Sequence, residues 1–155
     1  LPIGAFISTE EIWKVFEENP LIHSSTLGGN PLACTAGLET LKVLQEESIP
    51  AQAEEKGNYW MGELRALQEQ FSDLVKDVRG MGLLIGMEFF DSDIASLLAA
   101  EMAERKVLVA YTLNNPRVIR LEPPLTIKKE EIEKVTRALG ESLDKVRETL
   151  KEIGG

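Results

Sequence analysis

Residues 75–90 read VKDVRGMGLLIGMEFF, and this stretch decides the fold that we expect for the chain. Upstream of it, apolar residues recur at helical spacing, whereas here they favour strands from Val75 to Val78 and from Leu83 to Phe90. The Gly80-Met81-Gly82 tripeptide between the strands gives the backbone the freedom that a turn or bulge requires. Residues 75–90 therefore predict a pair of strands joined by a tight connection.

A helix is expected on each side of this strand pair. Before it, from Pro50 to about Ser72, apolar and small residues recur at intervals of three and four and form one buried stripe. The stripe consists of Ala53, Gly57, Trp60, Leu64, Leu67 and Phe71. After the strand pair, residues 93–105 return to the same helical spacing.

The C-terminal part predicts two more strands and a final helix. Residues 107–112 and 117–122 are expected to be strands on either side of a turn at residues 113–116. Thr126 is expected to cap the last helix. The apolar stripe of that helix consists of Ile132, Val135, Leu139, Leu143, Val146 and Leu150. The order strand-strand-helix-strand-strand-helix predicts a small α+β domain over residues 48–155.

Residues 1–47 predict the end of a larger α/β domain. The apolar run IGAFIS, residues 3–8, predicts a buried strand, and Ser8 with Glu11 predicts a capping box at the start of a short helix. A longer helix over residues 31–47 would connect this part to the small domain. Because the chain begins inside the expected strand, we expect it to be a piece of a longer polypeptide.

The composition is that of an ordinary soluble globular protein, with 43% hydrophobic and 28% charged residues. A formal net charge of −9 argues against binding to nucleic acid or to an anionic membrane surface. No apolar run reaches the length of a membrane span, and no signal peptide is visible. The single cysteine, Cys34, cannot form an internal disulfide, which fits a reducing cytoplasm, and its small neighbours predict a core position.

The loop IHSSTLGGNPLACTA, residues 22–36, combines hydroxyl groups, a glycine pair and the start of a helix. Asn30 is a favourable N-cap, and Pro31 suits the first helical position. Free amides, hydroxyls and the positive end of a helix dipole together suit a phosphate or another anion. A polar loop ahead of a well-capped helix explains the same residues without a ligand, and composition alone favours that simpler explanation.

Arg120 is a second candidate for binding an anion. Strand alternation over residues 117–122 places it with Glu122 on the face opposite Ile119 and Leu121. A guanidinium in the middle of a strand can hold a carboxylate through two parallel hydrogen bonds. An ion pair within the sheet, for example with Glu122, is the more common reason for such an arginine.

Other kinds of active site are not supported by the sequence. One histidine and one cysteine, without paired ligand spacing, argue against a metal site, and His23 has no nucleophile motif nearby. Gly80-Met81-Gly82 lacks the third glycine of a dinucleotide-binding motif. The pairs Glu10-Glu11 and Glu130-Glu131 lie at helix starts, where carboxylates complement the helix dipole.

Three segments, in this order and at these distances, resemble class III pyridoxal-phosphate aminotransferases of fold type I. They are HSSTLGGNPLACTAGLETL (residues 23–41), VRGMGLLIGMEF (78–89) and VIRLEPPLT (118–126). The resemblance runs from Leu1 to about Leu150. It is closest to putrescine (diamine) aminotransferases, on PAQAEEKG and VLVAYTLNNPRVIRLEPPLT. It implies that residues 1–47 end a large cofactor domain and that the small domain has an antiparallel-rich sheet with helices on one face.

The resemblance also implies roles for three residues. Thr26 matches the threonine that hydrogen-bonds the phosphate of pyridoxal 5'-phosphate across the interface of a homodimer, and Ser25 lines the same place. Arg120 matches the arginine that binds the α-carboxylate of glutamate or 2-oxoglutarate. His23 is expected only to shape the loop. The implied substrates are a small-molecule amine and a 2-oxo acid.

In this family the lysine that forms the Schiff base with the cofactor lies shortly before the segment that matches LPIGAF, residues 1–6. We therefore expect this chain to lack a catalytic residue and to be inactive alone. The whole protein is expected to transfer an amino group from a diamine such as putrescine to 2-oxoglutarate. Class III enzymes of acetylornithine, ornithine, 4-aminobutyrate or glutamate semialdehyde remain alternatives, as does a stand-alone binding or assembly domain.

Overall fold

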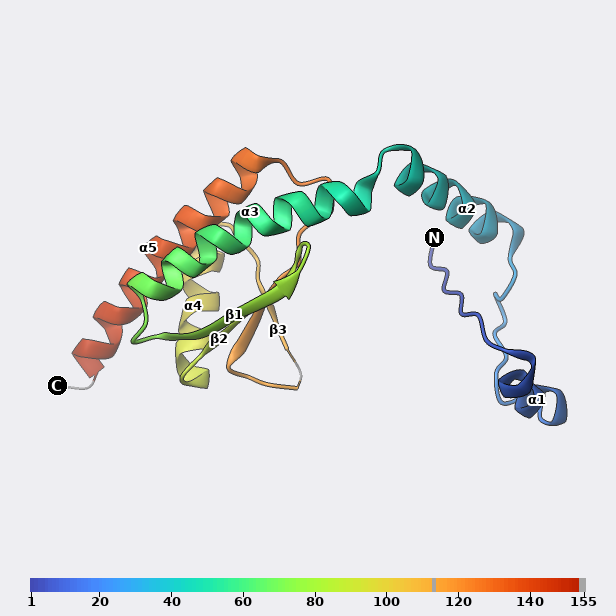
Figure 1. Ribbon diagram of the computed structural model, residues 1–155. Coiled ribbons are helices and arrows are strands. Elements are labelled where there is room, and N and C mark those ends of the chain that lie inside the picture. Colours follow the sequence, from blue (N-terminus) through green and yellow to red (C-terminus); the bar gives the residue numbers. More distant parts are fainter. Residues whose placement is uncertain (113, 154–155) are drawn as a thin grey trace. The chain divides into compact units, whose positions relative to one another are not determined.

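The structure is a computed structural model of the chain, and it describes residues 1–112 and 114–153. The chain divides into two compact units, Leu1–Ser48 and Ile49–Gly155. Figure 1 labels the helices and strands of both units. Leu113, which belongs to the turn expected at residues 113–116, lies outside the described residues.

The second unit is built on a four-stranded antiparallel sheet with the strand order β1-β2-β4-β3. The strands are β1 (Val75–Met81), β2 (Leu84–Phe89), β3 (Ala110–Tyr111) and β4 (Val118–Leu121). The hairpin β1-β2 provides one edge of the sheet and the short strand β3 the other. β4 therefore lies inside the sheet, paired on both sides.

The connection between β1 and β2 is tighter than the sequence predicts. β1 continues past Val78 to Met81, which pairs with Leu84, so only Gly82 and Leu83 form the turn. Gly82 has a φ of 55°, a left-handed conformation that glycine adopts at least cost. Two-residue turns of this kind match the twist of the strands they join, which lets the pairing continue up to the turn.

Three helices cover one face of the sheet (Figure 1): α3 (Ile49–Gln70), α4 (Ser92–Glu104) and α5 (Lys129–Ile153). Their apolar stripes and the inward-facing strand residues form one core. The largest fully buried side chains of this core include Trp60, Phe71, Phe89, Leu64, Ile85, Met87, Leu98, Met102 and Ile119. The predicted α+β architecture, an antiparallel sheet with helices on one face, is confirmed.

Two elements of this unit are shorter than predicted. The strand expected at 107–112 is limited to β3, because the backbone N–H of Val107 bonds instead to the carbonyl of Met102 at the end of α4, at 2.9 Å. Thr126 does not cap α5, which begins only at Lys129. The Glu131 carboxylate accepts a hydrogen bond from the backbone N–H of Lys128 at 2.8 Å, and so replaces the expected cap.

The first unit contains two helices, α1 (Glu10–Glu18) and α2 (Pro31–Glu46), and no strand among residues 1–48. The strand expected at residues 3–8 is therefore wrong, because a strand needs a partner to pair its backbone and this unit offers none. The expected capping box is also wrong, since the N-cap of α1 is Thr9 and its side chain makes no capping hydrogen bond. The predicted Asn30 cap of α2 is confirmed.

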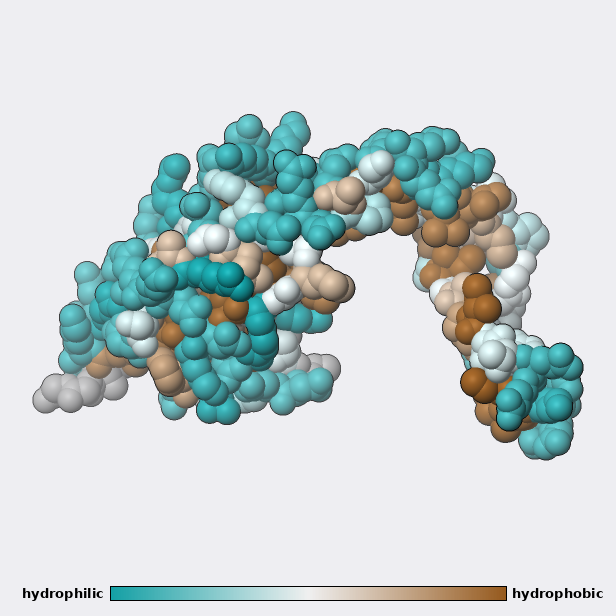
Figure 2. All heavy atoms as spheres, viewed as in Figure 1, coloured by the Kyte–Doolittle hydropathy of each residue, from teal (hydrophilic) through white to brown (hydrophobic). Residues whose placement is uncertain are grey.

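No residue of this first unit is buried. Cys34 is exposed, so its predicted core position is wrong: nothing within the unit packs over it. Many large apolar side chains are exposed as well, and Figure 2 shows apolar surface over this unit. They include Ile3, Phe6, Ile7, Ile12, Val15, Leu21, Ile22, Leu27, Leu32, Leu38 and Leu41. Hydrophobic burial within residues 1–48 therefore contributes little to holding this unit in shape.

Candidate functional site

The loop that precedes α2 presents two free hydroxyl groups. Ser25 and Thr26 are exposed, and within the described residues neither hydroxyl makes a hydrogen bond. The backbone turns sharply around them: the N–H of Gly28 donates to the carbonyl of Ser25 at 3.1 Å, and Gly29 has a φ of 69°. The structure thus brings Ser25 and Thr26 together just ahead of a helix N-terminus, where donors suit an anion.

The helix behind this loop is capped as the sequence predicts. The side-chain oxygen of Asn30 accepts hydrogen bonds from the backbone N–H groups of Leu32 at 3.1 Å and Ala33 at 3.2 Å. Pro31 follows the cap and has no N–H to satisfy. The cap fixes where α2 begins, and with it the end of the loop that carries Thr26.

His23 packs among aromatic rings at the start of the same loop. Its ring centroid lies 5.1 Å from that of Phe6 and 5.8 Å from that of Phe16. Both contacts are edge-to-face, a favourable arrangement for ring pairs. The contact with Phe16 connects the loop to α1, and that with Phe6 connects it to the segment before α1, which agrees with a role for His23 in shaping the loop.

Arg120 stands on the sheet face that the helices leave open. Its register partners are Gly86 on β2 and Ala110 on β3, so neither neighbouring strand places a large side chain beside it. Its side chain is 44% exposed, and the ion pair between its Nη1 and the Glu122 Oε2 is long, at 3.5 Å. A guanidinium with small neighbours and a loosely held partner is available to a carboxylate.

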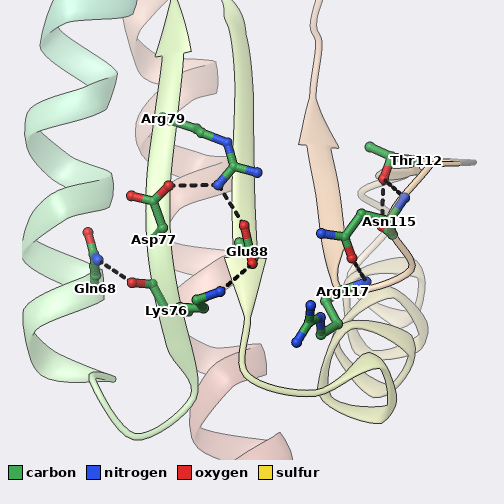
Figure 3. Close-up of polar contacts among 8 residues, drawn as sticks. All are labelled: Gln68, Lys76, Asp77, Arg79, Glu88, Thr112, Asn115 and Arg117. Carbon is green, nitrogen blue, oxygen red and sulfur yellow. Dashed lines mark hydrogen bonds and ion pairs between the residues drawn. The ribbon is translucent and has the colours of Figure 1, made fainter.

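A network of ion pairs covers the same open face (Figure 3). The Glu88 carboxylate accepts hydrogen bonds from Lys76 Nζ and from Arg79 Nη1, each at 2.8 Å. Arg79 Nη1 also donates to Asp77 at 2.6 Å. The register of β1 shifts between Val75 and Asp77, which lets Lys76 reach the same carboxylate. The charges of Lys76 and Arg79 are therefore already compensated by neighbouring carboxylates.

The network changes the proton affinities of its members. The hydrogen bonds from Lys76 and then Arg79 hold the pKa of Glu88 below its ordinary value of 4.5. The hydrogen bond to Asp77, and then that to Glu88, raise the pKa of Arg79. Both groups are charged at neutral pH, so the network acts as an ionic scaffold for the sheet and not as a proton donor or acceptor.

We expect Glu88→Gln to lower the free energy of unfolding at neutral pH. The difference in this free energy between the variant and the wild type should become smaller at acidic pH. A carboxyl whose folded-state pKa is depressed stabilises the fold above its unfolded pKa and loses this contribution as the pH falls through the folded value. The advantage of the wild type should therefore decline below about pH 4.5. Denaturant midpoints at neutral pH and at about pH 3.5 measure it. Exposed Glu69 on α3 gives the control Glu69→Gln, and a pH-independent deficit in Glu88→Gln would contradict the expectation.

The connection from β3 to β4 is held by hydrogen bonds of its own (Figure 3). The Thr112 hydroxyl donates to the carbonyl of Asn115 at 2.6 Å, and the Asn115 side-chain oxygen accepts from the backbone N–H of Arg117 at 3.1 Å. These bonds set the start of β4, and so the position of Arg120 along the sheet.

The sequence did not single out Gly86, Ala110 or Glu88. Strand alternation in the sequence is sufficient to predict that Gly86 and Glu88 lie on the same face of β2. Their proximity to Arg120 depends on which residues pair across β2 and β4, and one strand alone does not reveal that register. Ser25 and Thr26 lie in the first unit and Arg120 in the second.

Two further features are absent from residues 1–112 and 114–153. No group of three or more histidine, cysteine, aspartate or glutamate side chains there could hold a metal ion. No helix in the same residues combines the length and apolar character needed to cross a membrane.

Residues 1–143 match the profile of the family Aminotransferase class-III. Among solved structures, an acetylornithine aminotransferase from Elizabethkingia anophelis is 34% identical over 79% of this chain and 31% of its own, with a TM-score of 0.71. An ornithine aminotransferase from Toxoplasma gondii, with partial occupancy of PLP at its active site, is 35% identical over 91% of this chain and 33% of its own, with a TM-score of 0.76. The ornithine aminotransferase from Plasmodium yoelii is 33% identical over 80% of this chain and 32% of its own, with a TM-score of 0.72. This chain thus spans about a third of the length of each.

Proposed function

The chain belongs to the class III aminotransferases, a family of pyridoxal-phosphate-dependent enzymes of fold type I, and we propose that it supplies two parts of such an enzyme. Residues 1–47 are the end of the cofactor domain with its bridging helix, and residues 48–155 are the small domain. The whole protein, a cytoplasmic homodimer, transfers an amino group from a diamine such as putrescine to 2-oxoglutarate.

Bound pyridoxal phosphate would supply the electron sink that amino transfer requires. In this proposal the chain holds the phosphate of the cofactor. The Thr26 hydroxyl donates to that phosphate in the partner's active site, and Ser25 lines the same place. The free hydroxyls beside the capped N-terminus of α2 support this assignment. The Schiff-base lysine would be supplied by a segment outside this chain, so the chain alone would be inactive.

The observation that carries the proposal is the setting of Arg120. It is half exposed on the open sheet face, between Gly86 and Ala110, and its partner Glu122 is 3.5 Å away. A planar guanidinium in this position can bind the α-carboxylate of 2-oxoglutarate through two parallel hydrogen bonds. Two other cations on that face are already held in ion pairs. Lys76 is paired with Glu88, and Arg79 is paired with both Asp77 and Glu88.

The alternative is a different amino donor for the same site. Similar solved structures include an acetylornithine aminotransferase and an ornithine aminotransferase, which favours an amino acid donor as the second candidate. The two candidates differ chemically, because ornithine and acetylornithine carry an α-carboxylate and putrescine carries none.

A donor panel tests the proposal on the full-length protein loaded with pyridoxal phosphate. With 2-oxoglutarate as acceptor, putrescine and cadaverine should give a higher kcat/KM than ornithine, acetylornithine and 4-aminobutyrate. A preference for ornithine or acetylornithine would favour the second candidate. No transamination with any donor would contradict the proposed function as a whole.

A further inference from the structure

Glu122 is held beside Arg120 by the proline that follows it. Pro123 restricts the residue before it to extended conformations, so the alternation of β4 continues past Leu121 to Glu122. Arg120 and Glu122 are two positions apart and share one side of the strand. Their side chains meet in the ion pair between Arg120 Nη1 and Glu122 Oε2 at 3.5 Å.

This ion pair differs from the others on the same face. Glu88 has a side chain that is 11% exposed and lies 2.8 Å from both of its cations. Glu122 has a side chain that is 52% exposed, and no hydrogen bond within the described residues joins it to Arg120. A pair as open as this contributes little to stability and is easily separated by a ligand. Packing and stability therefore give no reason for a carboxylate at this position.

A diamine donor poses a problem that a carboxylate here would solve. It has no carboxylate to offer Arg120, and its second amine is protonated at neutral pH, as the ordinary pKa of an alkylamine requires. Beside a free guanidinium that ammonium group would be repelled. An acid substrate meets the opposite situation, because the guanidinium attracts it.

Building on the function proposed above, we propose that Glu122 is a specificity-determining residue that accepts the distal ammonium group of the diamine donor. Its carboxylate offsets the charge of Arg120 and keeps an oxygen exposed for the ammonium group. The neighbouring pair then serves both substrates, since Arg120 binds the carboxylate of the acceptor and Glu122 binds the ammonium group of the donor. The register partners of Arg120, Gly86 and Ala110, place no large side chain beside it.

The test compares two donors that differ only in the group that Glu122 would bind. Putrescine and n-butylamine share a four-carbon chain, and butylamine lacks the second ammonium group. The ratio of their kcat/KM values, measured in full-length enzyme with 2-oxoglutarate, should favour putrescine in the wild type. Glu122→Gln should lower this ratio about tenfold or more, because a charge-assisted hydrogen bond is lost. Glu104→Gln, at an exposed carboxylate on α4, makes the same charge change and should leave the ratio unaltered.

Each outcome decides a separate point. An unchanged ratio in Glu122→Gln, with a wild type that uses putrescine, overturns the role of Glu122 and leaves the proposed function standing. A wild type that uses neither putrescine nor cadaverine overturns both. Should Glu122→Gln fail to fold, judged by circular dichroism, Glu122→Ala removes the same carboxylate and carries the same expected loss.

Discussion

Arg120→Ala in the full-length enzyme is expected to lower kcat/KM for 2-oxoglutarate about 100- to 1000-fold, since removing one partner of a hydrogen-bonded charge pair costs about 3–4 kcal/mol. The strands on either side of β4 offer no group that would compensate. Gly86 and Ala110 have no polar side chain, and Arg79 is bound to Asp77 and Glu88. Arg120→Lys keeps the charge but loses the two-pronged geometry, so about a 10- to 100-fold loss is expected.

Steady-state kinetics with varied 2-oxoglutarate and saturating amine donor measure both effects. The half-exposed side chain of Arg120 has a single long ion pair among the described contacts, so its loss should change the free energy of unfolding by no more than about 1 kcal/mol. Arg137→Ala, at an exposed arginine of α5, is the matched control and should stay within about twofold of the wild type. A kcat/KM for 2-oxoglutarate that is unaffected in Arg120→Ala would remove the main support for the proposed acceptor.

The two proposed anion sites differ in what holds them in place. Arg120 projects from a strand that is paired on both sides and backed by the buried core of the second unit. Thr26 projects from a loop in a unit that buries none of its residues. Side chains on strands are positioned more precisely than those on loops. The position of Arg120 is thus set by the second unit itself, whereas burial within residues 1–48 does little to fix that of Thr26.

Local patterns were sufficient to predict most of the second unit. The stripes of α3 and α5 were read from spacing alone, and their members Trp60, Leu64, Ile132 and Leu139 are buried. Errors arose where a segment's state depends on a distant partner. The apolar run at residues 3–8 looked like a strand but has nothing to pair with in its unit. An apolar run predicts that a segment is buried, but it does not identify the part of the protein that buries it.

The candidate site was predictable to a similar extent. Alternation correctly placed Arg120 opposite Ile119 and Leu121, and proximity in sequence correctly suggested Glu122 as its ion-pair partner. The ionic scaffold around Glu88 was missed, because it depends on the register between β1 and β2 and on the irregularity between Val75 and Asp77. Register is a property of two strands together, so a single stretch of sequence does not determine it.

The packing of α3 against the hairpin depends on a contact between two glycines. A Cβ atom added at Gly57 would lie 2.1 Å from the carbonyl oxygen of Gly82, which belongs to the β1-β2 turn. Gly82 itself has a positive φ, so that turn has little freedom to adjust. Helical spacing predicts that Gly57 belongs to the buried stripe of α3, but it does not show how closely the turn approaches the helix.

Gly57→Ala is therefore expected to destabilise the second unit by about 3 kcal/mol or more, because backbone meets backbone and α3 must move away from the hairpin. Gly62→Ala in the same helix is the matched control. An added Cβ there meets nothing within 4 Å, so the better helix propensity of alanine should stabilise the fold by about 1 kcal/mol. Chemical denaturation followed by circular dichroism measures both variants. If Gly57→Ala lowers the free energy of unfolding and Gly62→Ala raises it, the difference is due to the contact with Gly82. If Gly57→Ala leaves the free energy of unfolding unchanged, the hairpin does not pack this closely against α3.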